Sequence, residues 1–345
     1  MDIKNNTTGN KMDAGQAKIV RDRRFLITGG LGFVGTAIAR RLLQEGAKKV
    51  ILFDVDKPLP DLLANERGNA RIEVVAGDIR NPDDVSRAVS GVDYVFHEAG
   101  LRVTRCAKEP RLAHEIMVDG TFNVVYACVE HRVKKLVHAS SAIVYGEPVH
   151  LPLDEEHPAH DLTLYGIFKI VNENLLRSFK KTQGLDFIAL RYFNIYGPGM
   201  NISGPEVEVL IRWLDRMDEG VSPAVFGDGK QTLDYIFIDD VVEANWQALW
   251  SRESGEVFNV CTGRETSVLE LLKLLSKIRN WSLQPEFHES RSVNQVARRF
   301  GSPDKALKRL NFKARVSLEE GLRKLVTWRD QLLAQKARLK EHQVQ

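Results

Sequence analysis

The chain has few cysteines, little net charge and no long apolar run. Its cysteines are Cys106, Cys128 and Cys261, and three scattered thiols form neither a disulfide framework nor a zinc-ligand spacing, which favours a reducing cytoplasm. The formal net charge is only +3 over 345 residues, which argues against a nucleic-acid-binding protein with a concentrated basic face. No apolar run approaches the roughly 20 residues of a membrane span, and the polar N-terminal segment lacks the apolar stretch of a secretory signal.

Histidines with a metal-ligand spacing are also missing. His157 and His160 flank Pro158, but no third and fourth ligand follows at a suitable distance along the chain. We therefore expect no bound metal and interpret both histidines as solvated loop residues.

Short apolar segments alternate with amphipathic ones over the first 195 residues. The expected strands are 25–27, 50–53, 72–75, 94–96, 135–139 and 186–192, and the expected helices include 36–45, 82–89 and 117–130. Apolar strands alternating with helices indicate a parallel sheet covered on both faces. Because crossover connections are right-handed, the expected class is α/β with a Rossmann-like doubly wound sheet. Beyond residue 195 the segments shorten and Gly and Pro become denser, which indicates a smaller C-terminal lobe.

A glycine-rich turn follows the first expected strand. The segment TGGLGFVG holds Gly29, Gly32 and Gly35, which permit a tight turn, a close approach of a pyrophosphate and close helix–strand packing, respectively. Asp54 ends the second expected strand, 19 residues after Gly35, where a carboxylate accepts hydrogen bonds from a ribose and disfavours a 2′-phosphate. A turn without a ligand is the alternative for the glycines alone, whereas the combination with Asp54 favours NAD over NADP.

Tyr165 and Lys169 stand four residues apart on an expected helix, and Ser141 follows an apolar strand. Residues at i and i+4 share a helix face. An ammonium beside a phenol lowers the pKa of the phenol, which suits it to general acid–base catalysis. Taken alone, the Tyr–Lys pair also fits an ordinary helix surface. Ser141 strengthens the catalytic interpretation, because ligands bind at the carboxyl ends of parallel strands.

Ten ordered segments resemble those of one enzyme family. The chain is similar to extended short-chain dehydrogenases/reductases of the NAD-dependent nucleotide-sugar epimerase/dehydratase family, and to UDP-sugar 4-epimerases in particular. The segments are TGGLGFVG (28–35), Asp54, GDI (77–79), HEAG (97–100), GTFNV (120–124), SSAIVYG (140–146), YGIFK (165–169), RYFNIYGPG (191–199), GDGKQTLDYIFIDDV (227–241) and EEGLRKLVTW (319–328).

The resemblance implies a role for each matching residue. Tyr165 is the implied general base, Lys169 binds the nicotinamide ribose and tunes Tyr165, and Ser141 is the hydroxyl partner of the reaction. The implied NAD-binding residues are Gly29, Gly32, Phe33, Val34, Gly35, Asp54, Asp78, Ile79, Ala99, Tyr165 and Lys169. The implied substrate-binding residues are Ser141, Asn194 and Arg291, of which Asn194 and Arg291 contact the diphosphate.

The expected organisation has four parts. Residues 1–22 form a disordered leader, and residues 23–195 form the NAD-binding domain that carries the catalytic residues. Residues 196–330 form mainly the nucleotide-sugar lobe, with some chain returning to the first domain, and 331–345 form a polar tail. The resemblance also implies a homodimer that pairs through helices near 113–131 and 165–180 in a four-helix bundle.

Some residues depart from the family pattern and leave alternatives open. Leu233 stands where many UDP-sugar epimerases have a phosphate-binding arginine, and Glu98 stands where an apolar residue is common. Arg298 and Arg299 fit either phosphate ligands or surface arginines.

The expected reaction is C4 epimerisation through a transient 4-keto sugar. A 4,6-dehydratase would need an Asp-Glu pair after the serine, where this chain has Ala142 and Ile143. Net oxidation or reduction of a sugar, which would release NADH or consume it, is a second alternative. A non-catalytic dinucleotide sensor is a third, which the complete set of Ser141, Tyr165 and Lys169 disfavours.

Overall fold

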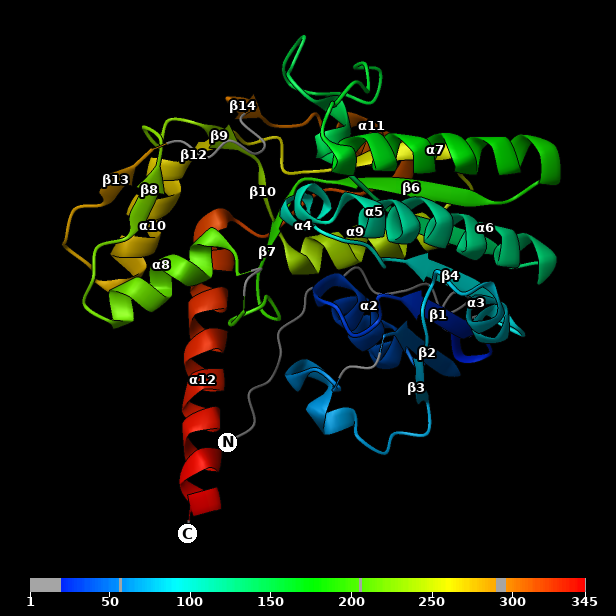
Figure 1. The fold of residues 1–345 in the computed structure, drawn as a ribbon, viewed down its shortest axis with the longest axis horizontal. Helices are drawn as coiled ribbons and strands as arrows, with labels where there is room; N and C mark the ends of the chain where they lie inside the picture. The colour runs from blue at the N-terminus through cyan, green and yellow to red at the C-terminus, as the bar shows by residue number, and fades with distance from the viewer. Residues whose placement is uncertain (1–19, 56–57, 205–206, 290–295, 345) are drawn as a thin grey trace.

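The computed structural model describes residues 20–55, 58–204, 207–289 and 296–344. Its centre is a seven-stranded parallel sheet with the strand order β11-β6-β5-β4-β1-β2-β3 (Figure 1). The strands are β1 (Arg24–Thr28), β2 (Lys49–Asp54), β3 (Ile72–Ala76), β4 (Tyr94–His97), β5 (Lys135–Ser141), β6 (Phe187–Tyr192) and β11 (Glu256–Val260). The predicted doubly wound parallel sheet is confirmed, including the late return of residues 256–260 beside β6.

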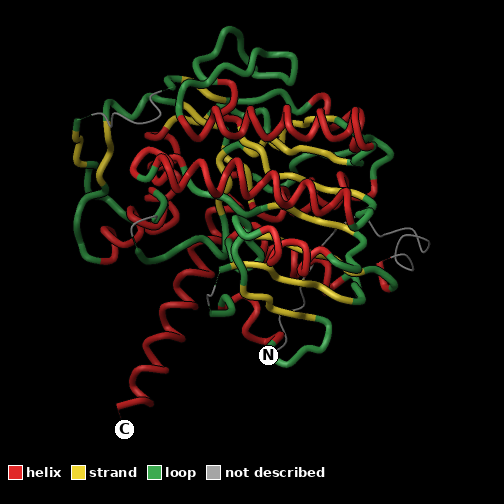
Figure 2. The backbone as a smooth tube through the Cα atoms, turned by 45° about the vertical axis from the view of Figure 1, so that its right-hand side comes forward, coloured by secondary structure: helices red, strands yellow, loops and turns green. Residues whose placement is uncertain are grey.

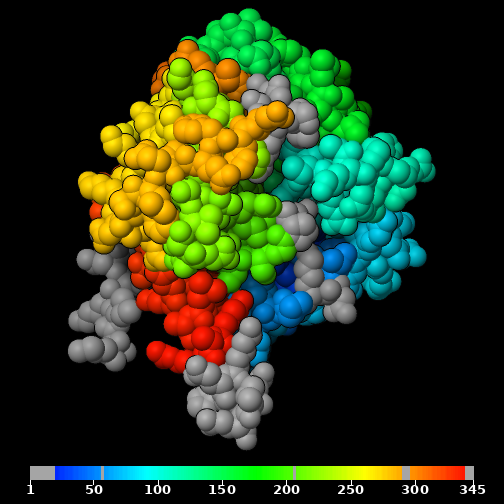
Figure 3. Space-filling model, turned by 60° about the vertical axis from the view of Figure 1, so that its left-hand side comes forward, coloured from blue at the N-terminus to red at the C-terminus, as the bar shows by residue number. Residues whose placement is uncertain are grey.

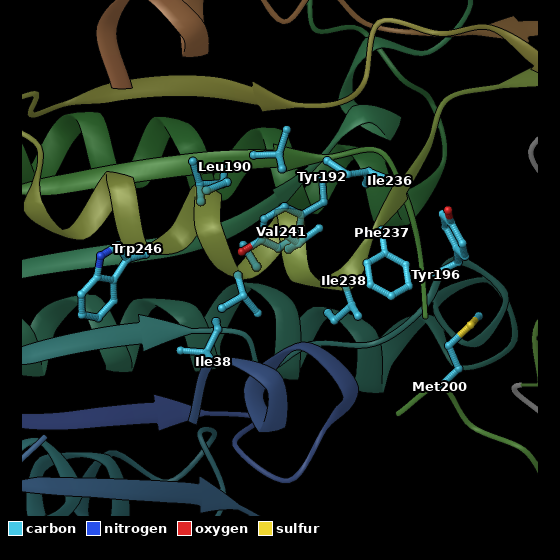
Figure 4. Close-up of a cluster of buried hydrophobic side chains, with 14 of the residues drawn as sticks. Ile38, Leu190, Tyr192, Tyr196, Met200, Ile236, Phe237, Ile238, Val241 and Trp246 are labelled. Atoms are coloured by element: carbon cyan, nitrogen blue, oxygen red, sulfur yellow. The ribbon is translucent and has the colours of Figure 1, made fainter. Parts of the chain in front are cut away.

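Helices cover both faces of this sheet. The helices beside it are α2 (Phe33–Gln44), α3 (Pro82–Val89), α6 (Thr121–Glu130), α7 (Leu164–Gln183) and α9 (Ile238–Trp250). Alternate side chains of β1 point to opposite faces of the sheet, as in any β-strand. Phe25 and Ile27 lie in one core with Ile38 of α2 and the apolar side of α9, and Figure 4 shows Ile38 facing α9. Leu26 lies in a second core with Val124 of α6.

Between β4 and α6 the chain forms three short helical turns. They are α4 (Val103–Lys108), α5 (Pro110–His114) and a π-helical turn, η2 (Glu115–Gly120). The 3₁₀ turns η1 (Asp61–Glu66) and η3 (Ala142–Tyr145) follow β2 and β5. The expected helix at 117–130 therefore begins as a π turn and becomes α-helical at Thr121.

In the described residues, the second lobe consists of short strands and three helices beside the large sheet (Figure 2), and Figure 3 shows its yellow-green to red surface next to the blue and cyan surface of the first lobe. The strands are β7 (Asn194–Tyr196), β8 (Ala224–Phe226), β9 (Thr232–Leu233), β10 (Tyr235–Phe237), β12 (Thr266–Ser267), β13 (Glu286–His288) and β14 (Arg298–Arg299). The helices of this lobe are α8 (Val209–Asp218), α10 (Val268–Arg279) and α12 (Leu318–Val344), whereas α11 (Asp304–Leu310) packs against β11 and α9 of the sheet domain. Strand β9 pairs with both β12 and β14, so segments more than 60 residues apart in the chain meet in this lobe.

Two predictions concern chain segments outside the sheet. The leader expected at 1–22 lies outside the described residues up to position 19, and its predicted end at residue 22 is wrong, because Val20 is fully buried in the core. The prediction of a solvated His157 is wrong, because this side chain is only 2% exposed. Its Nε2 accepts a hydrogen bond from the Val149 N–H at 2.8 Å, and its Nδ1 donates to the Pro158 carbonyl at 2.8 Å. His160 is exposed, as predicted.

In the described ranges, no helix is both long and apolar enough to cross a bilayer.

Candidate active site

A cavity of about 920 Å³ lies at the carboxyl ends of the sheet strands and extends to the second lobe. With the exception of Arg291, every predicted site residue lines it: Gly29, Gly32, Phe33, Val34, Gly35, Asp54, Asp78, Ile79, Ala99, Ser141, Tyr165, Lys169 and Asn194. Arg291 falls in the segment 290–295, outside the described residues. The structure therefore brings together residues that are spread over 165 positions of the chain.

The glycine turn forms one wall of the cavity from bare backbone. Gly29 has a φ of +67°, and a Cβ there would lie 2.8 Å from the backbone nitrogen of Ala99. A Cβ on Gly35 would lie 2.3 Å from the Gly29 carbonyl oxygen, so a side chain at either position would displace backbone. A Cβ on Gly32 would meet only the Gly29 carbonyl oxygen, at 3.1 Å. Gly32 is the N-cap residue of helix α2, and its bare backbone at the helix N-terminus suits the pyrophosphate of NAD.

Asp54 holds the end of β2 against this turn. Its Oδ2 accepts a hydrogen bond from the Leu31 N–H at 3.1 Å, and the side chain borders the cavity. A carboxylate has lone pairs beyond those used here, so Asp54 can also accept from ribose hydroxyls. The turn and Asp54 together fit the pyrophosphate and ribose of NAD.

Asp78 reaches the same cavity as one half of an ion pair. Its Oδ2 accepts hydrogen bonds from Arg80 Nε at 2.9 Å and from a terminal nitrogen of Arg80 at 2.6 Å. This hydrogen bonding lowers the pKa of the Asp78 carboxyl. Ile79, between these two residues in the chain, is only 6% exposed and contributes an apolar surface to the cavity wall.

Ser141, Tyr165 and Lys169 meet at the centre of the cavity. Helix α7 starts at a Thr163 cap, whose hydroxyl accepts from the Gly166 N–H at 3.1 Å, and this start places Tyr165 in the first turn. Lys169 follows one turn later. Its Nζ donates to the Ala139 carbonyl at 2.6 Å and lies 5.7 Å from the centre of the Tyr165 ring.

The predicted lowering of the Tyr165 pKa is wrong for this structure. Burial raises the pKa of Tyr165 to about 12, although hydrogen bonding with Ser141 opposes the rise. The physical reason is that the Lys169 ammonium is directed at the Ala139 carbonyl rather than at the phenol oxygen. Burial also lowers the pKa of Lys169 to about 8, so its ammonium loses a proton more readily than usual but is still mostly charged at neutral pH.

Glu98 adds a carboxyl group whose position the sequence did not predict. Its Oε1 accepts a hydrogen bond from the Tyr192 hydroxyl at 3.1 Å, and that hydroxyl accepts from Asn245 Nδ2 at 2.8 Å. Burial raises the pKa of Glu98 to about 7, against the opposing effects of Tyr192 and Lys169. The sequence does contain a signal for this position, namely a charged residue directly after a buried strand. Such positions lie at the ligand-binding edge of parallel sheets.

The second lobe contributes the far wall of the cavity. Asn194 Nδ2 donates to the Asp234 carbonyl at 3.4 Å. Leu233 pairs in register with Arg299 across β9 and β14, and both residues line the cavity. The adjacent residues Arg298 and Arg299 also have different environments. Arg298 is exposed and forms a bidentate pair with Glu265 at 2.6 and 2.7 Å, whereas Arg299 is only 3% exposed.

Comparisons with known proteins agree with this geometry. The sequence profile of the NAD dependent epimerase/dehydratase family matches residues 25–261. A putative UDP-glucose 4-epimerase of Methanocaldococcus jannaschii is 33% identical over 307 residues, which are 88% of this chain and 97% of that protein.

Two solved structures share the whole fold. UDP-glucose 4-epimerase of Thermotoga maritima with UDP-glucose superimposes with a TM-score of 0.84 at 32% identity, over 90% of this chain and 99% of that one. UDP-glucuronic acid 4-epimerase of Bacillus cereus, in complex with UDP-glucuronic acid and NAD, gives a TM-score of 0.82 at 27% identity, over 90% and 99% of the two chains.

Proposed function

The chain belongs to the NAD-dependent epimerase/dehydratase family, and we propose that it inverts C4 of a UDP-sugar, with NAD as a cofactor that is regenerated in each turnover. The observation that carries this proposal is the meeting of Ser141, Tyr165 and Lys169 in the cavity that the glycine turn and Asp54 also line. One cavity thus holds a proton-transfer group beside a dinucleotide site, as a redox epimerisation requires.

The cofactor half of the cavity has the residues for NAD. The backbone of the glycine turn would hold the pyrophosphate, Asp54 the adenosine ribose, and Lys169 the nicotinamide ribose. When bound, NAD supplies the reversible two-electron exchange with C4 of the sugar.

Tyr165 moves the proton in this proposal. As a phenolate, its oxygen takes the proton from the sugar O4 while C4 is oxidised to the ketone, and the resulting phenol returns that proton to O4 when C4 is reduced from its other face. Ser141 hydrogen-bonds the same oxygen and opposes the rise in the Tyr165 pKa. A Lys169 ammonium stabilises the phenolate that exists before Tyr165 takes the proton and after it has returned it, and the Lys169 pKa of about 8 leaves most of the ammonium charged at neutral pH.

The surroundings of Ser141 favour epimerisation over dehydration. Loss of water from a 4-keto sugar needs a second acid–base pair near the ring. Ala142 is buried and Ile143 borders the cavity, and neither side chain can carry a proton. The 4-keto intermediate is therefore reduced again rather than dehydrated.

A direct experiment tests this function. The purified protein is incubated with UDP-, GDP-, dTDP- and CDP-sugars, and NMR follows new C4 diastereomers. We expect epimerisation of a UDP-sugar without added NAD, because a regenerated cofactor stays bound. Stoichiometric NADH release would instead indicate a dehydrogenase. A tightly bound dinucleotide without turnover on any sugar would indicate a sensor.

We also propose that two copies pair through α6 and α7. These neighbouring helices expose Phe122 and Tyr126 on α6, and Ile167 and Val171 on α7, each between 37% and 45% exposed. Four apolar side chains on adjacent helices suit burial against the same surface of a second copy. Light scattering should give twice the 39.0 kDa chain mass, and a single-chain mass at micromolar concentration would contradict the dimer.

A reducing, cytoplasmic setting is part of the same proposal. Cys106, Cys128 and Cys261 are free thiols and all are buried. A protein with only unpaired cysteines gains nothing from an oxidising compartment.

A further inference from the structure

Glu98 is a carboxyl group in the cavity that the proposed reaction does not use. It lines the cavity directly after β4, at a position where an apolar residue is common in the family. Its backbone N–H donates to the Thr28 carbonyl at 3.1 Å, and a Cβ on Gly29 would lie 2.9 Å from the Glu98 carbonyl carbon. The residue therefore lies directly against the glycine turn that follows β1.

The side chain of Glu98 extends from this turn toward β6. Its Oε1 accepts the hydrogen bond from the Tyr192 hydroxyl at 3.1 Å, and Tyr192 pairs in register with Ser141 across β6 and β5. Asn245 fixes that hydroxyl, because its Nδ2 donates both to the Tyr192 oxygen at 2.8 Å and to the Val241 carbonyl at 2.9 Å. The carboxyl group is thus held in place between the glycine turn and the strand end beside Ser141.

A bound dinucleotide has to cross this position. Strand β4 lies between β1 and β5 in the sheet. The pyrophosphate of NAD belongs at the glycine turn after β1, and hydride exchange takes place beside Ser141 at the end of β5. A cofactor that joins these two points passes over the end of β4. Lys169, the residue expected to hold the nicotinamide ribose, has its Nζ 4.0 Å from the position of a Cβ on Gly100, two residues after Glu98.

A carboxylate at this place acts on the charge of the nicotinamide ring. The ring is positively charged in NAD⁺ and uncharged in NADH, so a neighbouring negative charge stabilises the oxidised form relative to the reduced one. Burial raises the pKa of Glu98 to about 7, which leaves the group mostly ionised at pH 8, and a positive ring beside it favours the carboxylate further. An apolar residue at position 98 would have no such effect.

We infer that Glu98 borders the nicotinamide ring and that its carboxylate shifts the bound cofactor toward NAD⁺. This inference rests on the proposed epimerisation with a bound NAD. In that reaction the hydride taken from C4 of the sugar returns to the same carbon. Stabilising the oxidised ring favours this return, so Glu98 shortens the lifetime of the 4-keto sugar and keeps the resting cofactor oxidised.

The first test measures the redox balance of the bound cofactor without any sugar. NAD-loaded parent and Glu98→Gln proteins are equilibrated at pH 8 with a redox dye of known potential, and the near-ultraviolet absorbance of NADH gives the bound ratio of NAD⁺ to NADH. We expect this ratio to be at least about 10-fold lower in Glu98→Gln, because a unit charge beside the ring acts through a low dielectric. The glutamine keeps an oxygen that accepts from Tyr192. Glu98→Leu should lower the ratio as well, and Glu98→Asp, which keeps the charge, should lower it less. An unchanged ratio in Glu98→Gln and Glu98→Leu would overturn the inference.

Glu208→Gln is the matched control. Glu208 also lines the cavity, but it comes from the second lobe, where it pairs with Arg102 at 2.5 Å and is 47% exposed. Its removal changes the charge of the cavity by the same amount at a solvated site, so the ratio of NAD⁺ to NADH should stay within about twofold of the parent. An equal fall in Glu98→Gln and Glu208→Gln would show that the net charge of the cavity sets the ratio, and would overturn a specific role of Glu98.

Two further measurements separate this role from others and from the proposed reaction. During turnover of a UDP-sugar, Glu98→Gln should accumulate bound NADH that the parent does not. A lowered ratio of NAD⁺ to NADH in Glu98→Gln, without turnover of any nucleotide sugar by the parent, would support the inference and contradict the epimerisation. Weaker binding of UDP-sugars by Glu98→Gln with an unchanged ratio would show that Glu98 is a substrate ligand, and would overturn the inference while epimerisation stands.

Discussion

The two halves of the cavity are built in different ways. The cofactor half comes from the ends of β1, β2 and β3 and the start of α2, which follow one another within about 55 residues. Its surfaces are largely backbone, as at Gly29 and Gly32. The substrate half combines the segment after β4 with β7, β9 and β14, whose residues lie between Glu98 and Arg299, and its surfaces are side chains.

This difference in construction matches a difference in function, because the cofactor half recognises a ligand common to all turnovers and the substrate half recognises a particular sugar. Backbone cradles and a helix N-terminus recognise a phosphate whatever else the ligand carries, so the cofactor half suits one invariant ligand. Side chains on short strands can change individually without disturbing the sheet, so the substrate half can be adapted to a particular sugar. Changes in the cofactor half should therefore affect all substrates alike, and changes in the substrate half should alter the preference between sugars.

The largest expected effect comes from Tyr165, which lies where the two halves meet. Tyr165→Phe keeps the ring that packs against the buried cluster of Cys106, Ala113, Met117 and Phe168 and removes the oxygen that carries the proton. General acid–base catalysis contributes about 10²- to 10⁴-fold, so kcat should fall by that factor with little change in KM. The measurement is the steady-state rate on the UDP-sugar that the parent epimerises, with bound NAD quantified after acid extraction.

A second tyrosine provides the control for that variant. Tyr145 is fully buried, and its hydroxyl donates to Asn259 at 2.6 Å, outside the cavity. Tyr145→Phe removes the same atom without touching the substrate, so kcat should stay within about twofold while the melting temperature falls slightly. Turnover by Tyr165→Phe close to that of Tyr145→Phe would show that Tyr165 does not carry the proton.

A substitution at Asp54 tests the cofactor half of the cavity without changing the substrate half. Asp54→Ala removes the acceptor expected for the adenosine ribose, and loss of a charged hydrogen bond should weaken NAD binding by about 10- to 100-fold. Titration of NAD-free protein by calorimetry measures this loss. Asp54→Asn is the matched control, because it keeps one acceptor for the Leu31 N–H and should lose less. At saturating NAD the ratio of rates on UDP-glucuronate and UDP-glucose should not change, and a changed ratio would break the distinction between the two halves.

The features that could be predicted from the sequence lie mainly in the cofactor half of the cavity, and those that could not lie mainly outside it. The sheet, the glycine turn and Asp54 were predictable because strand, turn and helix follow one another, so local periodicity and glycine spacing describe them. The placement of Arg299 opposite Leu233 was not, because it depends on pairing between two-residue strands whose partners are 66 positions apart. The raised pKa of Tyr165 was also missed. Spacing places Lys169 on the same helix face, but it does not show that the ammonium is directed at the Ala139 carbonyl.

Glu98 should give the smallest of these effects, seen as a change in stability with pH. Its pKa is raised from 4.5 to about 7 in the folded protein because burial disfavours the carboxylate. The folded state therefore binds more protons than the unfolded state between these values, and stability should fall as the pH rises from about 4.5 through about 7. Glu98→Gln has no charge to bury and keeps an oxygen that accepts from Tyr192, so it should lack this loss.

The measurement is the melting temperature of NAD-free parent and Glu98→Gln proteins across this pH range. Near pH 4.5 the parent carboxyl is mostly protonated when folded, so the two should melt together. By pH 8 the variant should melt about 2–5 °C higher, which corresponds to about 1–3 kcal/mol for a carboxylate that borders a solvent-filled cavity. Glu73→Gln is the control, since its carboxylate is 46% exposed in a surface pair with Lys49 and should give no such divergence. A constant difference between parent and Glu98→Gln at every pH would mean that Glu98 titrates normally, and that the substrate half contains no buried carboxyl of raised pKa at this position.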